Sequence, residues 1–245
     1  MIEAGSLIRS LSGRPAARNF HTFVINEIGH GIVTGRFPVG SILASDAVMM
    51  ETYGVSRTVL REALKTLESK GLVEARPKVG TRVSPQSRWS YFDPQVLAWH
   101  FYAKPDRQFY DGLFDVRTAL ETRAAAMAAQ RRTAENIRVM KYWLHQMQSS
   151  AGDLENHGIA ALEIHRTIAD TSGNVMLRSV TGIVELTVAL ALKDCVARGA
   201  GTYLAQTSEA LTRLVAAIGE ADVEAAISTV EEVIRLDEAR VLALV

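Results

Sequence analysis

The sequence holds a single cysteine, Cys195, among its 245 residues. One cysteine cannot form an internal disulfide or supply a thiolate zinc cluster. No apolar run approaches the ~20 residues of a membrane helix, and the N-terminal residues lack the ~7 to 15-residue apolar stretch of a secretory signal. The sequence therefore predicts a cytoplasmic chain without a membrane segment.

Enzyme signatures are missing as well. The chain has no glycine-rich phosphate loop and no nucleophile elbow, and no base stands at a telling spacing from Cys195. An all-α enzyme with Cys195 or His165 as its catalytic group is an alternative that rests only on the presence of these residues. We therefore predict that the protein is not an enzyme.

Charge is balanced over the whole chain but not along it. The 27 Lys and Arg equal the 27 Asp and Glu, yet basic residues outnumber acidic ones up to residue 85 and acidic ones prevail afterwards. A basic first part suggests a module that faces an anion, although this excess alone is a weak sign of nucleic-acid binding. With 48% hydrophobic residues, the chain has enough apolar material for packed cores.

Three helical patterns occupy the first part of the chain. Residues 20–35 carry apolar side chains at helical spacing. Residues 42–54 predict a second helix, which Ser45 or Asp46 can cap. A third helix, with Ser56 as its N-cap and Gly71 as its terminator, follows after a gap of only two residues. Two helices joined by a tight turn predict a helix-turn-helix.

The third helix has two different faces. Leu60, Leu64 and Leu67 fall on one arc, whereas Arg57 and Arg61 fall on another. One face can pack while the other binds, and a DNA major groove admits such a helix. Short β-prone runs around RPKVG then predict a basic hairpin, which completes a winged helix. A solvated surface helix is the alternative for this segment taken alone.

The stretch VSRTVLREALKTLESKGLVEARPKVGTRV, residues 55–83, is similar to the signature of GntR-type bacterial transcription regulators. This resemblance implies that a set of basic and small residues meets DNA: Arg36, Ser56, Arg57, Thr58, Arg61, Lys78 and Gly80. It places Ser56, Lys78 and Gly80 on phosphate or the minor groove. Arg57 and Arg61 are the best candidates for base readout, because only a guanidinium fork bonds guanine bidentately.

The periodicity breaks at SPQSRWSYFDP, residues 84–94, so we place a domain boundary near residue 86. Almost nothing strand-like follows, and the apolar spacing predicts an all-helical bundle of about six or seven helices. The predicted fold is mainly α, with three parts: a flexible segment at 1–18, a winged helix-turn-helix DNA-binding domain at 19–85, and an all-helical effector-binding and dimerisation domain at 86–245.

The second half resembles the FCD ligand-sensing domain of the FadR subgroup of this family. The resembling stretches are DVRTALETRAAAMAAQRR, HRTIADTSGN and AIGEADVEAAISTV. The segment SRWSYFDPQVLAW is also similar to a linker in relatives of the galactonate-operon repressor. The resemblance implies a homodimer whose helical domains sense a small carboxylate effector, and whose winged helices hold or release a palindromic double-stranded DNA operator.

The common FCD form binds a divalent metal through Asp-x-x-x-His on one helix and two later histidines. Aligned on the resembling stretches, this chain has His165 at the first histidine and apolar residues at the other three positions: Ala161, Leu211 and Val233. One imidazole cannot hold a divalent ion, so we expect no metal and no other cofactor. The spacing of Asp153 and His157 is interpreted as chance, because it precedes the matching helix by two turns.

Arg117 and His165 are the candidate effector-binding residues. An arginine beside the apolar stripe of its helix needs a partner, because burying an unpaired charge is costly. Glu121, one turn on, is the structural partner, whereas the resemblance makes Arg117 a clamp for the effector's carboxylate. His165 is either a histidine satisfied within the bundle or a donor to an anionic effector.

The predicted function is that of a ligand-responsive transcription regulator, a repressor released from its operator by a small carboxylate metabolite. The linker resemblance favours a sugar acid. Two alternatives stay open. The helical domain could serve only to dimerise, or it could sense an acyl-CoA-like ligand, which the apolar Leu211 and Val233 mildly favour.

Overall fold

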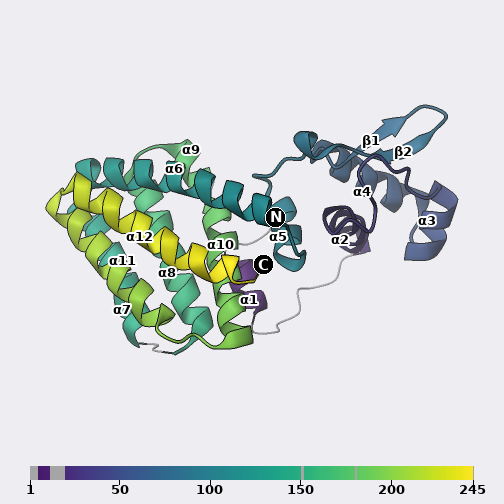
Figure 1. Ribbon diagram of the computed structural model, residues 1–245. Helices are drawn as coiled ribbons and strands as arrows, with labels where there is room; N and C mark the ends of the chain where they lie inside the picture. Colours follow the sequence, from purple (N-terminus) through teal and green to yellow (C-terminus); the bar gives the residue numbers. More distant parts are fainter. Residues whose placement is uncertain (1–4, 12–19, 150–151, 180, 245) are drawn as a thin grey trace. The chain divides into compact units, whose positions relative to one another are not determined.

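The structure is a computed structural model that describes residues 5–11, 20–149, 152–179 and 181–244. The chain divides into two compact units (Figure 1). The DNA-binding unit comprises residues 15–105, and the helical unit joins residues 1–14 to residues 106–245. The predicted fold class, a winged helix-turn-helix followed by an all-α domain, is confirmed.

The DNA-binding unit is built on the helix-turn-helix pair α3 and α4, with α2 packed against α4. Buried side chains such as Val24, Ile28, Leu60 and Leu67 form its core. Its elements are, in chain order, α2 (Phe20–Val33), α3 (Asp46–Tyr53), α4 (Arg57–Ser69), β1 (Val73–Arg76), β2 (Gly80–Val83), a 3-10 turn η1 (Gln86–Arg88) and α5 (Pro94–Tyr102).

The two strands pair antiparallel, with Val73 opposite Val83 and Arg76 opposite Gly80. The valines at the base of the hairpin are buried, which fixes the register, since a slip by one residue would expose both. An isolated bridge from Ile42 to Arg82 ties β2 to the segment before α3.

Local capping explains where the helices start and stop. Ser45 accepts from the Val48 N–H at the start of α3, and Gly54 ends that helix at φ 63°. Gly71, after α4, has φ 76°, and a Cβ at this position would lie 1.9 Å from the carbonyl oxygen of Arg88. Only glycine fits at this point, because both the backbone conformation and the close approach exclude a side chain.

The structure divides the units at Pro105, whereas the sequence placed the boundary near residue 86. The difference arises because α5 packs on α2. The indole N–H of Trp99 donates to Asn26 at 3.1 Å, and a Cβ on Gly29 would lie only 2.5 Å from the Trp99 ring. Trp89 and Trp99, both from the segment that resembled a linker, are thus part of the winged-helix core.

The helical unit is a bundle in which α12 packs against α6, α10 and α11, while α8 packs against α6, α7 and α10 (Figure 1). Its described elements are α1 (Ser6–Ser10), α6 (Arg107–Arg131), α7 (Ala134–Ser149), α8 (Leu154–Thr171), α9 (Val175–Ser179), α10 (Thr181–Arg198), α11 (Tyr203–Glu220) and α12 (Val223–Leu242). Across the parts of the chain that the structure describes, no helix has the length and apolar character needed to cross a membrane.

Part of the segment predicted to be flexible, 1–18, is instead folded into the helical unit. The Leu7 N–H of α1 donates to the carboxylate of Glu185 on α10 at 2.9 Å. Ile8 is fully buried, and a Cβ on Gly158 of α8 would lie 2.9 Å from its side chain. The remainder of that segment, residues 1–4 and 12–18, lies outside the described residues.

Candidate DNA-binding surface and effector cavity

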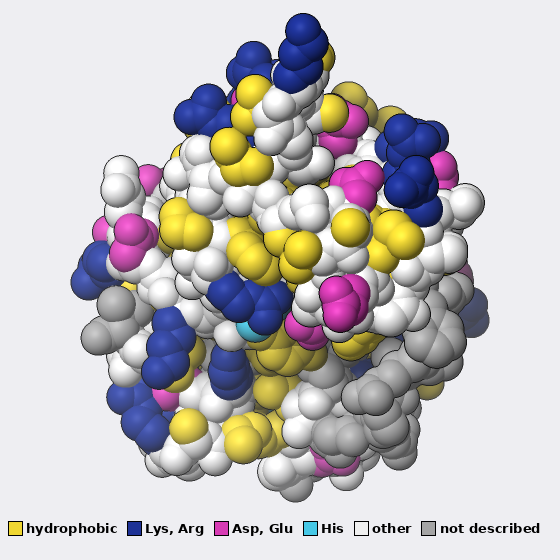
Figure 2. Space-filling view, turned by 90° about the vertical axis from the view of Figure 1, so that its right-hand side faces the viewer, with side chains coloured by type: hydrophobic (Ala, Val, Ile, Leu, Met, Phe, Trp, Pro, Cys, Tyr) yellow, Lys and Arg dark blue, Asp and Glu magenta, His cyan; other side chains and the backbone are white. Residues whose placement is uncertain are grey.

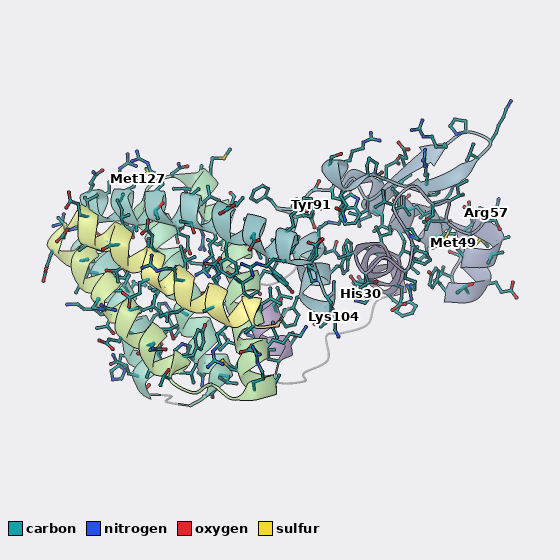
Figure 3. All side chains as sticks on the ribbon, in the orientation of Figure 1. His30, Met49, Arg57, Tyr91, Lys104 and Met127 are labelled. Carbon is teal, nitrogen blue, oxygen red and sulfur yellow. The ribbon has the colours of Figure 1, made fainter. Side chains whose placement is uncertain are left out.

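Helix α4 presents a basic face to solvent. Ser56 caps the helix, since its hydroxyl accepts from the Val59 N–H at 3.4 Å. Arg57, Thr58 and Arg61 are exposed, while Leu60, Ala63 and Leu67 are buried on the opposite side. Within the described residues, neither Arg57 nor Arg61 forms a hydrogen bond or ion pair. Both guanidinium groups are therefore available to a ligand. Figure 3 labels Arg57 on α4 and Met49 on the neighbouring helix α3.

The hairpin β1–β2, called the wing below, borders the same face. A groove of about 780 Å³ runs between α4 and the wing, and its lining includes Arg57, Thr58, Arg61 and Gly80. Four of the seven residues predicted to meet DNA are thus gathered in one groove. Figure 2 shows Lys and Arg side chains clustered at the top of this view, where the wing lies.

The tip of the wing is a four-residue turn in which the Val79 N–H donates to the Arg76 carbonyl oxygen at 3.1 Å. Lys78 adopts φ 63° in this turn, a conformation that costs free energy for any residue with a Cβ. Lys78 is exposed in this turn, so its ammonium group is accessible, and its contact with phosphate stays a prediction.

Arg36 is less available than the other predicted contacts. Its Nη2 donates to the backbone carbonyl of Glu27 at 2.5 Å and lies 3.6 Å from the carboxylate of the same residue. Its guanidinium also lies 4.9 Å from the centre of the Phe37 ring. Arg76, which is not among the predicted contacts, also lines the groove. Its Nη2 lies 2.7 Å from a carboxylate oxygen of Glu74.

A buried polar cluster lies inside the helical unit. Arg117 on α6 is 1% exposed. Its Nε donates to Glu121 at 2.7 Å, and its Nη1 donates to Asp237 on α12 at 2.6 Å and to Thr187 on α10 at 2.9 Å. Its Nη2 has no partner among the described residues. Arg117 therefore has the structural partner Glu121 and one guanidinium nitrogen left free.

His165 on α8 completes the cluster. Its Nδ1 lies 2.5 Å from the second carboxylate oxygen of Glu121, and its Nε2 is buried without a partner among the described residues. A buried polar atom without a hydrogen-bond partner is costly, so each such atom in a native fold calls for a ligand or an ordered water.

Neighbouring charges determine the ionisation of Glu121 in this cluster. Burial alone would raise the pKa of Glu121, but His165 and Arg117 lower it to about 2, so Glu121 is ionised at neutral pH. The Tyr203 hydroxyl donates to Asp237 at 2.6 Å, and burial raises the pKa of Tyr203 well above its usual value. Arg117 thus lies between two carboxylates, and each has a second partner: His165 for Glu121, and Tyr203 for Asp237.

A small cavity adjoins Arg117, Glu121 and His165. Its volume is about 20 Å³, enough for roughly one water molecule. Leu177 of α9 and Val184 of α10 are also in its lining. An organic ligand can therefore enter only if the lining moves.

A divalent metal does not fit this cluster. Ala161, Leu211 and Val233 are buried apolar side chains and offer no donor atoms. Across the described residues no three His, Cys, Asp or Glu side chains are grouped as a metal site. Asp153 instead caps α8, and the His157 ring bonds the Thr207 hydroxyl at 2.9 Å. Leu211 and Val233 are also absent from the cavity lining, so they give no support to an acyl-binding pocket.

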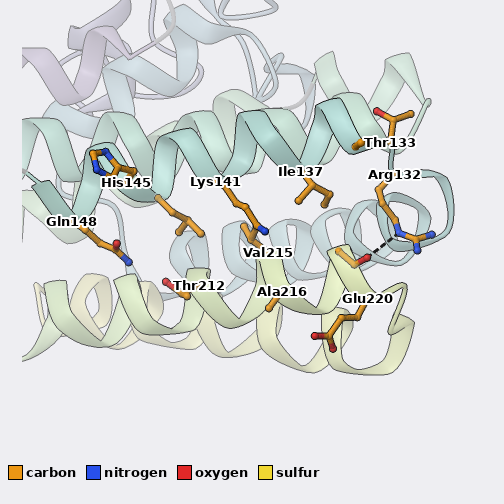
Figure 4. Close-up of a pocket in the computed structure, with 13 residues that line it drawn as sticks. Arg132, Thr133, Ile137, Lys141, His145, Gln148, Thr212, Val215, Ala216 and Glu220 are labelled. Atoms are coloured by element: carbon orange, nitrogen blue, oxygen red, sulfur yellow. Dashed lines mark hydrogen bonds between the residues drawn. The ribbon is translucent and has the colours of Figure 1, made fainter.

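A larger groove, about 890 Å³, follows the surface between α7 and α11 (Figure 4). Arg132, Lys141 and His145 border it, and Arg132 donates to the Gly219 carbonyl at 3.3 Å. Its polar side chains reach solvent, and none of its lining atoms is a buried donor without a partner in the described residues. The small cavity is therefore the better candidate for a specific ligand.

The winged helix and the bundle with its closed polar cavity together define a DNA-binding regulator with a sensing domain. Residues 21–83 match the gntR family of bacterial regulatory proteins, and residues 112–236 match the FCD domain. The chain therefore belongs to the GntR family, in the group that carries an FCD domain. These are ligand-responsive transcription regulators and not enzymes.

Two relatives are regulators of Escherichia coli K12. The uncharacterized HTH-type transcriptional regulator YieP is 32% identical over 67% of this chain and 72% of its own length. The galactonate operon transcriptional repressor is 27% identical over 64% of this chain and 69% of its own.

Solved structures share the fold. Lar, which controls expression of the Listeria monocytogenes agr system, has a TM-score of 0.68 at 19% identity, covering 94% of this chain and 100% of its own. Escherichia coli McbR/YncC has a TM-score of 0.55 at 20% identity, covering 93% of this chain and 99% of its own.

The bundle also contains a buried histidine that should make stability depend on pH. Burial lowers the pKa of His157 to about 4. The unfolded chain then binds the extra proton below about pH 6.5, so stability falls as the pH drops from 6.5 towards 4, by roughly 2 to 3 kcal/mol. We expect urea unfolding of wild type to show this loss.

The matched variant is His157→Gln. The Thr207 hydroxyl donates to the Tyr203 carbonyl oxygen, so the His157 Nε2–H donates to Thr207, and a Gln amide can do the same. His157→Gln should flatten the pH dependence between 6.5 and 4.5, while the exposed His145→Gln should not. Parallel curves for all three proteins would rule out His157 as the source.

Proposed function

We propose that the protein is a dimeric repressor that binds an inverted-repeat operator and is released by a small carboxylate metabolite, with a sugar acid as the favoured class. The observation that carries the effector proposal is the pair of buried, unpartnered nitrogens, Arg117 Nη2 and His165 Nε2, beside one cavity. A carboxylate offers two acceptor oxygens, and an arginine fork suits it.

The charge of the cluster limits the class of ligand that it favours. Glu121 and Asp237 already offset the charge of Arg117, so a bare anion gains little net attraction. A hydroxy acid gains more, because its carboxylate can accept from Arg117 Nη2 while its hydroxyl, which both donates and accepts, can bond His165 Nε2. The galactonate operon repressor among the relatives adds support for a sugar acid.

The residues of the groove support the DNA half of the proposal. Arg57 and Arg61 are free and sit near the start of α4, where the helix dipole also favours an electron-rich partner. In a dimer, two such helices enter successive major grooves about one helical turn apart. Lys78 and Gly80 of the wing are then placed for the backbone or minor groove.

Binding of the effector and binding of the operator are coupled through their free energies. An effector can enter only when the cavity lining moves, because the closed cavity holds about 20 Å³. If the open form places the two winged helices less well for the operator, the effector weakens DNA binding by the same coupling free energy, typically ~1 to 3 kcal/mol.

A thermal-shift screen tests the effector proposal. The full-length protein is heated with sugar acids such as galactonate, with short hydroxy acids and with acyl-CoA, each with and without EDTA. At about 100 times its Kd, a true effector should raise the melting temperature by about 5 to 10 °C, and EDTA should not change this.

His165→Leu serves as the site variant, since it removes one of the two unpartnered nitrogens. We expect it to lose the shift caused by the active acid. Stabilisation that EDTA abolishes would contradict the metal-free site. Absence of any shift across the panel would favour a helical domain that only dimerises, and a shift from acyl-CoA alone would replace the sugar acid.

A further inference from the structure

A short helix near the start of the chain docks on the helical unit. Helix α1 contacts α10 and α8, and Figure 1 shows it beside α10. Leu7 is 6% exposed and Ile8 is fully buried, so both belong to the core of the bundle. An isolated helix of this length is not stable in water, because helix nucleation is costly. Helix α1 therefore depends on the surface of α8 and α10 that receives it.

The surface that receives α1 is shaped for it on α8. A Cβ at Gly158 would lie 2.9 Å from Cγ2 of Ile8 and 2.4 Å from Cδ1 of Leu192 on α10. Gly158 lies within α8, where any residue can adopt the helical backbone and where glycine weakens the helix. The close approach of Ile8 and Leu192 is therefore what requires glycine at this position.

The second contact is a buried carboxylate on α10. Glu185 is 8% exposed and accepts from the backbone N–H groups of Leu7, at 2.9 Å, and of Gly5. These belong to the N–H groups that the first turn of a helix leaves without an intrahelical acceptor. Burial raises the pKa of Glu185, and the two N–H groups oppose that rise. Gly158, Glu185 and Leu192 are together called the α1 dock below.

The helices of the α1 dock also line the cavity. Helix α8 contributes His165 to the lining, and α10 contributes Val184. Val184 directly precedes Glu185 in the chain, and Thr187, two residues further on, accepts from Arg117 at 2.9 Å. A movement of the cavity lining that shifts α10 therefore also moves the carboxylate that holds α1.

Helix α1 gives the DNA-binding unit a second attachment to the helical unit. One attachment is the connection from α5 to α6, residues 103–106. The other consists of the eight residues 12–19, between Leu11 and the start of α2. Because a chain spans at most ~3.6 Å per residue, this connection limits the separation of α1 and α2 to about 30 Å. While α1 is docked, the DNA-binding unit is therefore restrained at both of its ends.

We propose that α1, held in the α1 dock, restrains the DNA-binding unit for operator binding, and that movement of the cavity lining releases α1. This inference rests on the proposed function and adds the element that joins its two halves. Two recognition helices must enter grooves about one helical turn apart. A unit attached at one end only loses more freedom when it binds, so its affinity is lower. By linkage, operator binding in turn stabilises the docked α1.

Operator affinity of full-length variants tests the restraint, with an inverted-repeat operator obtained by in vitro selection. Ile8→Asp places a charge at a buried position and should release α1. It should weaken operator binding about tenfold, since such couplings typically amount to about 5- to 150-fold. Val196→Asp is the matched control, because Val196 is 60% exposed on α10, and it should bind like wild type. Affinity of I8D within about threefold of wild type would overturn the restraint.

Thiol labelling measures the docking of α1 itself. In the variant C195A/I8C the only cysteine replaces the buried Ile8, so a slow reagent such as iodoacetamide modifies it when α1 undocks. The operator should slow this reaction several-fold, whereas the same concentration of random-sequence DNA should not. An equal rate with operator and with random DNA would contradict the inference even if I8D failed to fold.

Galactonate separates failure of this inference from failure of the proposed function. If galactonate raises the melting temperature, it should also speed the labelling of C195A/I8C, because movement of the lining releases α1. A raised melting temperature with an unchanged labelling rate would overturn the link between cavity and α1. If galactonate causes no thermal shift, the sugar-acid proposal fails, and the operator measurements decide this inference. Failure to select any operator for wild type would overturn the DNA half of the proposed function, and the restraint with it.

Discussion

Arg57→Ala and Arg61→Ala should each weaken operator binding by at least ~30-fold. A bidentate arginine–guanine contact contributes about 1 to 3 kcal/mol of discrimination. In the proposed dimer each substitution removes that contact twice, so about 2 to 6 kcal/mol of binding free energy is lost per operator. Both residues are exposed, so folding should be unaffected.

The measurement is fluorescence anisotropy with a labelled inverted-repeat operator obtained by in vitro selection, at several salt concentrations. Arg138→Ala on α7 is the matched control, since it removes one exposed arginine from the helical unit. Base contacts predict that the two α4 variants lose preference for the operator over random DNA. Phosphate contacts alone would instead lower affinity equally for all sequences and reduce the salt slope by about 1 per contact.

Operator affinity within about threefold of wild type for both variants would show that α4 is not the recognition helix. The groove between α4 and the wing would then lack its main basic contacts, and the assignment of Lys78 and Gly80 would fail with it. An effect confined to one of the two arginines would leave the helix assigned and would identify which residue reads the base.

Local features of the sequence were enough to predict the DNA-binding unit. Periodicity, the serine caps at Ser45 and Ser56, and the glycines after α3 and α4 all act within a few residues along the chain. The register of the wing follows from two valines at its base. Each of these signals is encoded by neighbours, so the sequence carries it directly.

The effector cluster could be predicted only in part, because its contacts join distant segments. The i,i+4 spacing of Arg117 and Glu121 predicted one of the ion pairs. The pair between Arg117 and Asp237 spans 120 residues, and the bond between Tyr203 and Asp237 joins two helices. No local pattern marks such contacts.

The two compact units of the structure divide at a place other than the predicted boundary for the same reason. Trp99 belongs to a helix whose partner, Asn26, lies 73 residues away, and Leu7 bonds a glutamate 178 residues away. Short segments near a domain edge carry little pattern of their own. Their placement depends on which core accepts their apolar side chains, and only the folded structure shows that.

Arg117→Met should destabilise the helical unit by about 3 to 5 kcal/mol. The substitution leaves Glu121 and Asp237 buried without their shared cation, and removing one member of a buried ion pair costs about this much. Small domains are stable by only about 5 to 15 kcal/mol, so the loss should be a large part of the total. Urea unfolding followed by circular dichroism at pH 7 measures it.

The triple variant R117M/E121Q/D237N distinguishes a charge effect from a packing effect. It removes all three charges while keeping side chains of similar size, so it should recover most of the lost stability. If Arg117 acted mainly by filling space, Met would suffice and the single variant would lose under about 1 kcal/mol. The triple variant should still fail to bind a carboxylate effector, because Arg117 Nη2 is gone. Full stability combined with loss of the thermal shift would therefore separate the two roles of Arg117: neutralising the buried carboxylates, and offering a donor to the ligand.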